Sequence, residues 1–135
     1  MRLAGRLRVV IMLALIFTVQ QTGAGQGGKI IKRVKFDPGS SSAVLKGAIS
    51  KGREVVYVLG ARKGQRLEAS IDGKSEANDV VFSITGPDGK SLMGREGDDY
   101  DTKWSGVLPK TGDYQLTVGT IESKSARYTL KVSIR

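Results

Sequence analysis

The sequence predicts an all-β fold, an antiparallel two-sheet β-sandwich of about seven to eight strands that follows an N-terminal signal peptide. Apolar residues alternate with polar residues along most of the chain, which is the period of half-buried strands. Turn-forming runs such as Asp72-Gly73 and Pro87-Asp88-Gly89 interrupt this pattern at short intervals. No segment after residue 25 has the apolar period of a helix. Short alternating strands separated by frequent turns are typical of a β-sandwich.

The first 25 residues have the order of a secretory signal peptide. Three arginines form a basic start, an uncharged apolar run covers residues 9–19, and small or polar residues lead to Ala24 and Gly25. This order predicts cleavage after one of these two residues and export to the periplasm or the cell exterior. The alternative is an uncleaved anchor, but a membrane-spanning helix needs about 20 apolar residues. We therefore expect residues 26–135 to form a single domain with no transmembrane segment.

The expected mature domain is basic and lacks cysteine. Loss of residues 1–25 removes three arginines and no acidic residue, which lowers the formal net charge from +9 to +6. Without disulfides, the fold must rest on apolar packing and sheet hydrogen bonds. A positive charge favours acidic partners such as nucleic acid, anionic lipid or anionic glycan. Because the basic residues are scattered singly without interleaved aromatic residues, and because the chain is exported, we expect no nucleic-acid partner.

Several segments predict strands with one face on a core. Residues 67–71, 114–118 and 128–134 alternate strictly between apolar and polar side chains. Residues 43–49 contain a further strand with apolar positions. Tyr114 opens an inward-facing strand, so we expect its ring to be buried.

Two apolar runs, at residues 55–59 and 80–84, predict central strands because both faces of each run are apolar or nearly so. Ile30, Val34 and Phe36 are expected on one face of a first strand. The lysines and arginine interspersed with them are typical of a solvated edge strand, where they block sheet-to-sheet pairing.

The residue types exclude most catalytic sites. The chain has no histidine and no cysteine, which removes Ser-His-Asp, Cys-His and His-metal sites. Ser40–Ser42 with Lys46 could form a Ser-Lys pair, but a serine-rich turn explains these residues more simply. The acidic residues of 96–101 crowd one loop without a rigid opposing partner, which is a poor arrangement for glycoside hydrolysis. We therefore expect a binding protein that is not an enzyme and uses no cofactor.

The same acidic loop contains candidate ligands for a metal. Asp98, Asp99 and Asp101 offer hard oxygen atoms on a turn, which suit calcium. Their spacing matches no known calcium-loop signature, and a solvated turn is the alternative interpretation.

The stretch from Tyr57 to Val132 resembles the bacterial pre-peptidase C-terminal domain. The resemblance rests on Y-V-L-G-A from residue 57, K-G-Q-R-L from residue 63, G-P-D-G from residue 86, L-P-K-T-G-D-Y from residue 108 and Y-T-L-K-V from residue 128.

Nearly the whole mature chain also resembles the periplasmic inhibitors of g-type lysozyme. This resemblance adds V-K-F at residues 34–36, Gly39, S-S-A at residues 41–43 and Gly47. It implies the same sandwich, a lysozyme as protein partner, and inhibition by loops at one end of the sandwich. The family has a longer, Asn- and Arg-rich loop between its last two strands, whereas residues 119–126 make that connection here.

Polar residues in or beside the expected loops are the candidate contacts with such a partner, although ordinary solvated turns would also explain them. These candidates are Arg53, Lys110, Thr111, Lys124 and Arg127.

The alternative function is a stand-alone pre-peptidase-like module that binds glycan or matrix protein. An exposed patch of Tyr100 and Trp104 would favour this alternative. A single tryptophan in a small domain usually fills the core, however, and we expect Trp104 to do so.

Overall fold

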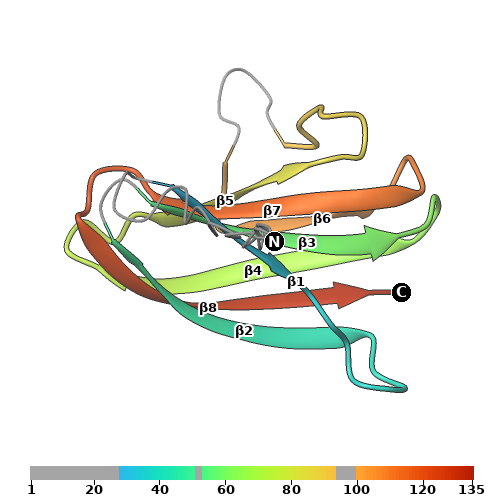
Figure 1. Ribbon diagram of the computed structural model, residues 1–135, viewed down its shortest axis with the longest axis horizontal. Coiled ribbons are helices and arrows are strands. Elements are labelled where there is room, and N and C mark those ends of the chain that lie inside the picture. The colour runs from blue at the N-terminus through green and yellow to red at the C-terminus, as the bar shows by residue number, and fades with distance from the viewer. Residues whose placement is uncertain (1–27, 51–52, 94–99) are drawn as a thin grey trace, which may run out of the picture.

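The computed structural model describes residues 28–50, 53–93 and 100–135, which form eight β-strands in two four-stranded sheets. The sheets form the two layers of a sandwich, and the described residues contain no helix (Figure 1). The predicted all-β sandwich is therefore confirmed, while the predicted signal peptide, residues 1–25, lies outside the described residues. The strands are β1 (Lys29–Arg33), β2 (Ser42–Ser50), β3 (Glu54–Ala61), β4 (Arg66–Ser75), β5 (Val80–Thr85), β6 (Lys103–Val107), β7 (Gly112–Thr120) and β8 (Ser125–Ile134).

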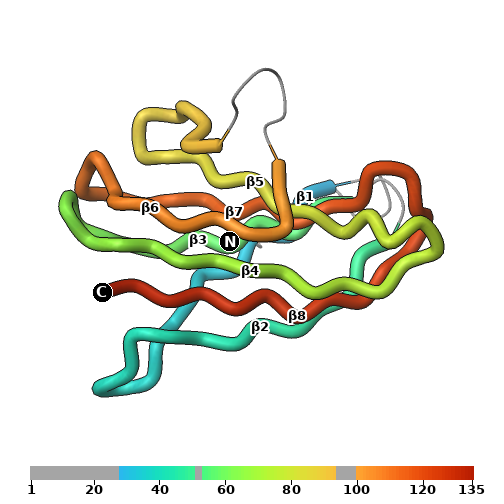
Figure 2. Tube along the Cα trace, turned by 180° about the vertical axis from the view of Figure 1, so that it is seen from behind, coloured from blue at the N-terminus to red at the C-terminus, as the bar shows by residue number. Residues whose placement is uncertain are grey.

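One sheet has the strand order β1-β3-β7-β5 and the other has the order β2-β8-β4-β6. The neighbouring strands are antiparallel except for β1 and β3, which pair in parallel. This pair corrects the expectation of a purely antiparallel fold. It arises because β2, which separates β1 from β3 in sequence, lies beside β8 in the opposite sheet (Figure 2). The chain therefore returns to the first sheet before β3, which pairs with β1 in the same direction.

The core lies between the sheets and follows the predicted alternation. In β7, Tyr114, Leu116 and Val118 are fully buried while the residues between them are more exposed. The predicted burial of Tyr114 is thus confirmed. The core also contains a polar contact, in which the hydroxyl groups of Tyr57 and Tyr128 lie 2.6 Å apart. Gly47 faces this pair, and a Cβ atom there would overlap the Tyr128 hydroxyl.

The predicted first strand is partly wrong. All five residues of β1 are exposed, including Ile30, and β1 lies at the edge of its sheet. Val34 and Phe36 do pack on the core, but they belong to the crossing segment that follows β1. The amide of Val34 donates to the carbonyl of Val58 and holds this segment against β3.

The run at residues 80–84 is an edge strand and not the predicted central strand. Its open edge is covered by the chain that follows, since Leu92 donates to the carbonyl of Ile84 and Phe82 forms a bridge with Asp101. This cover explains how a nearly continuous apolar run is accommodated at the edge of a sheet.

Trp104 lies on β6, half-buried and packed against the core. Its ring lies over Gly106, where a Cβ atom would approach two ring carbons at 2.8 Å. The expectation that Trp104 contributes to the core is therefore confirmed.

Candidate functional site

The turns of the sandwich gather at its two ends, and the five candidate contacts do not come together at either. Arg53 and Lys124 lie at the end formed by the β2–β3, β4–β5 and β7–β8 connections, on the left in Figure 1. Lys110 and Thr111 lie at the opposite end, on the β6–β7 turn. Strand β3 alone separates the two ends by about 26 Å. Arg127 lies on β8 itself, with its exposed side chain on the outer face of the sheet.

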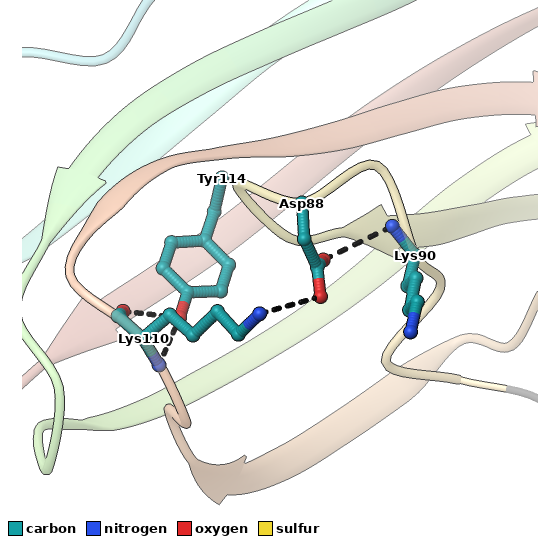
Figure 3. Close-up of polar contacts among 4 residues, drawn as sticks. All are labelled: Asp88, Lys90, Lys110 and Tyr114. Atoms are coloured by element: carbon teal, nitrogen blue, oxygen red, sulfur yellow. Dashed lines mark hydrogen bonds and ion pairs between the residues drawn. The ribbon is translucent and has the colours of Figure 1, made fainter.

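Lys110 and Thr111 form part of a turn that is fixed by Tyr114. The Tyr114 hydroxyl donates to the carbonyl of Lys110 and accepts from the amide of Lys110 at 3.1 Å (Figure 3). The Lys110 ammonium pairs with the Asp88 carboxylate at 3.1 Å. Thr111 accepts a hydrogen bond from the amide of Lys63 at 2.9 Å. We call this region, with the turns at residues 62–65, 86–90 and 108–111, the Tyr114 end.

Asp88 joins two turns of the Tyr114 end. Hydrogen bonds from the Lys90 amide and then from Lys110 lower the pKa of the Asp88 carboxyl, because both favour its charged form. The Asp88 carboxylate is therefore ionised in the folded protein and forms an ion pair with the Lys110 ammonium. These contacts give Lys110 a structural role in the turn.

The opposite end is organised by Asp79, a buried carboxylate that precedes β5. It accepts hydrogen bonds from the amides of Ser123 (2.8 Å) and Glu122, and from the Ser75 hydroxyl at 2.7 Å. Donors from Ser123 and Glu122 lower the pKa of Asp79 well below its usual range, in spite of the opposing effect of desolvation. We call this region, with Arg53 and residues 75–79 and 121–124, the Asp79 end.

Ser123 completes the connection between the two turns of the Asp79 end. Its hydroxyl accepts from the amide of Ala77 at 3.0 Å, and its carbonyl accepts from the Thr120 hydroxyl at 2.7 Å. The β7–β8 turn is thereby held at several points while Ile121 and Lys124 remain exposed. A short turn with fixed backbone and exposed side chains is suited to contact a partner with little loss of conformational entropy.

The sequence did not identify Asp79 as a functional or structural residue. Asp79 and Ser123 are 44 positions apart, and their turns come together because β5 pairs with β7 in one sheet and β4 pairs with β8 in the other. An aspartate directly before an apolar run indicates a turn, but it does not indicate the partner of the carboxylate.

The calcium prediction stays a prediction. Asp98 and Asp99 lie outside the described residues. Asp101 is exposed, and its carboxylate accepts from the amide of Thr102 at 2.6 Å. In the described part of the chain, no group of three or more metal-binding side chains occurs.

The serine run at residues 40–42 forms a local hydrogen bond between a side chain and the backbone. The Ser40 hydroxyl donates to the carbonyl of Ser42 at 3.0 Å, in agreement with the simpler, structural interpretation of this serine run. Over the residues that the structure describes, no helix is long and apolar enough to cross a membrane.

The chain matches individual known proteins in sequence and in structure. No protein-family model matches the chain. The inhibitor of g-type lysozyme from Escherichia coli strain K12 is 27% identical over 134 residues, which cover 96% of each chain. The crystal structure of PliG from Aeromonas hydrophila, a periplasmic inhibitor of g-type lysozyme, superimposes with a TM-score of 0.68 at 27% identity, over 80% of this chain and 98% of PliG.

Two further crystal structures differ in how similar their sequences are to this chain. PliG from Salmonella Typhimurium matches with a TM-score of 0.59 at 28% identity, over 78% of this chain and 98% of PliG. The pre-peptidase C-terminal domain of Bacillus anthracis collagenase matches with a TM-score of 0.51 at 13% identity, over 79% of this chain and 94% of that domain. The chain is therefore similar to the PliG proteins in both sequence and fold, and to the pre-peptidase domain in fold.

Proposed function

We propose that this protein is an exported, non-enzymatic inhibitor of a g-type lysozyme. The observation that carries the proposal is the similarity to the E. coli inhibitor, which extends over nearly the full length of both chains. The structural relatives are described as periplasmic, and we assign the same location to this protein. Inhibition by binding needs a rigid scaffold that presents loops, and the sandwich supplies one.

The Asp79 end is the part of the sandwich that we assign to the lysozyme. Its β7–β8 turn is fixed by Asp79 and Ser123, and it carries the exposed side chains of Ile121 and Lys124. Glycosidases generally cleave their substrates with a pair of carboxyl groups, which are suitable partners for cationic side chains. Lys124 and Arg53 can supply such cations from neighbouring turns, whereas Lys110 at the other end is already paired with Asp88.

Inhibition assays with two types of lysozyme test the proposal. The exported protein should inhibit lysis by a goose-type lysozyme and have a smaller effect on a chicken-type enzyme. Absence of both inhibition and heat of binding with the goose-type enzyme would contradict the proposed function.

Paired variants test the assignment to the Asp79 end. The double variant Arg53→Gln/Lys124→Gln should weaken binding by about 1–3 kcal/mol, as expected for charged contacts in an interface. The matched control Lys63→Gln/Lys90→Gln loses the same charge at the Tyr114 end and should bind like the original protein. A loss of affinity in the control, with the first variant unaffected, would move the contact to the Tyr114 end.

The aromatic patch that would favour a glycan or matrix module is not formed by Tyr100 and Trp104. Tyr100 lies beside Val81 and Thr117 on the outer face of the β1-β3-β7-β5 sheet. Trp104 belongs to the other sheet and packs on the core. The structure thus offers no support for the aromatic version of this alternative.

A further inference from the structure

Five basic side chains that are scattered in the sequence gather on the outer face of the β2-β8-β4-β6 sheet. Each alternates along its strand with residues that face the core, and each is exposed. Together they cover all four strands of the sheet, and we call them the basic face. They are Lys46 on β2, Lys74 on β4, Lys103 on β6, and Arg127 and Lys131 on β8.

The register places several of these charges close together. Arg127 lies directly opposite Lys74 on neighbouring strands. Like charges in directly opposite positions of a sheet repel each other and reduce stability. Four residues along β8, about 13 Å away, Lys131 lies in the same row as Lys103, with one residue of β4 between them. The row between the Arg127 and Lys131 rows holds Lys46 and Asp72, on either side of Thr129. The basic face is thus predominantly positive, with one carboxylate among its cations.

Ion pairs do not neutralise this area. Within the described residues, none of the five basic side chains comes within 4.0 Å of a carboxylate. Glu68 also lies on this face, but it interacts with Arg66 at 3.8 Å. Asp72 is the other acidic residue of these strands, and it leaves a clear excess of positive charge.

The surface between the charges is shallow and rich in hydroxyl groups. A groove runs across the sheet, and four serines line it together with Lys103 and Lys131: Ser42, Ser70, Ser105 and Ser133. Val44, Glu68 and Trp104 also line it. Val44 and Val107 are the large apolar side chains exposed on these strands. The outward positions of the four strands carry no aromatic side chain.

We propose that the basic face binds an anionic polysaccharide, with its acidic groups on the lysine and arginine side chains and its hydroxyl groups over the serines. Charge complementarity carries the assignment, since an excess of exposed cations beside a groove rich in serine hydroxyls matches a chain of sugars with carboxylate or sulfate groups. A single-stranded nucleic acid would require aromatic platforms for its bases. A protein partner would require an apolar centre, which two separate valines do not provide.

Binding of heparin, measured by calorimetry on the exported protein at several salt concentrations, tests this inference. The original protein should bind heparin in a salt-dependent manner and should not bind neutral dextran. The triple variant Lys46→Gln/Lys103→Gln/Lys131→Gln should bind heparin at least about tenfold more weakly and with a lower salt dependence, because fewer counterions are exchanged. The control Lys32→Gln/Lys63→Gln/Lys90→Gln loses the same charge elsewhere on the surface and should change the affinity less than about twofold.

Several results would overturn the inference. These are no binding of heparin by the original protein at low salt, an equal loss of affinity in both triple variants, or tighter binding of poly-glutamate or of phosphatidylglycerol vesicles than of heparin. Lysozyme inhibition is measured on the same samples and should be retained by the triple variant of the basic face. This readout reports whether the variant is folded and separates failure of the glycan site from failure of the proposed function.

Discussion

The two ends of the sandwich are fixed by different kinds of polar contact. At the Tyr114 end, a neutral hydroxyl bonds to backbone atoms only four residues away. At the Asp79 end, a buried carboxylate joins turns that are more than 40 residues apart in sequence. The first contact is local and insensitive to acid, whereas the second depends both on the assembled sheets and on the ionised state of one group. The buried Asp79 contact should therefore couple stability to pH, whereas the Tyr114 hydroxyl contact should not. The Asp88 carboxyl, whose pKa is also lowered, adds a more exposed acid-sensitive contact at the Tyr114 end.

The largest expected effect is at Tyr114. Tyr114→Ala removes a fully buried ring and the hydroxyl that fixes the β6–β7 turn. It should lower the free energy of unfolding by about 3 kcal/mol or more, as for other core aromatic residues. Urea denaturation measures this change. A loss below about 1 kcal/mol would show that the ring does not contribute to the core.

Asp79→Asn should have the second largest effect. Asparagine keeps the size of the side chain but removes the negative charge that accepts bonds from Ser123, Glu122 and Ser75. The amides of Glu122 and Ser123 would then lose a charged acceptor, and a buried donor with a weaker hydrogen bond lowers stability. The Tm should fall by a clearly measurable amount, but by less than in Tyr114→Ala. Thermal unfolding at pH 7 measures it. A Tm equal to that of the original protein would mean that the turns hold without the carboxylate.

Acid should reduce the difference between Asp79→Asn and the original protein. The folded-state pKa of Asp79 is lowered, so its stabilising effect is complete above the unfolded pKa, near 3.9, and is lost as the pH falls below that value. The gap in Tm between the two proteins should therefore be large at pH 7 and smaller at pH 3. Other carboxylates titrate equally in both proteins, so a constant gap would contradict the role of the Asp79 charge.

Tyr114→Phe separates the hydroxyl from the ring at the other end. The variant keeps the buried ring and loses the two hydrogen bonds with Lys110. We expect a loss of about 1 kcal/mol in urea denaturation, with no additional dependence on pH between 3 and 7. A loss as large as that of Tyr114→Ala would assign the whole effect to the hydroxyl.

The sequence predicts the burial of residues within one strand, because that burial follows the alternation of apolar and polar side chains. It does not predict contacts between strands that are distant in the chain. Burial of Tyr114 follows from alternation within one strand, and the sequence was sufficient for it. The lysines and arginine of the basic face appeared singly scattered, because the sequence does not reveal that β2, β8, β4 and β6 are neighbours. The same limit applies to Asp79, which bonds to Glu122 and Ser123 on the turn that follows β7. The candidate contacts were selected as polar loop residues, and this criterion could not distinguish the two ends.

The smallest expected effect on stability compares one lysine from each end. Lys110→Gln removes an exposed ion pair with Asp88, whereas Lys124 forms no ion pair with any of the described residues. Exposed pairs contribute little, and salt screens them. Both variants should therefore melt within error of the original protein at 0.15 M salt, and Lys110→Gln should melt slightly lower than Lys124→Gln at low salt. The order should reverse for lysozyme inhibition, where Lys124→Gln is the weaker inhibitor. If Lys110→Gln were the weaker inhibitor while its Tm stayed unchanged, the Tyr114 end would be the surface that meets the enzyme.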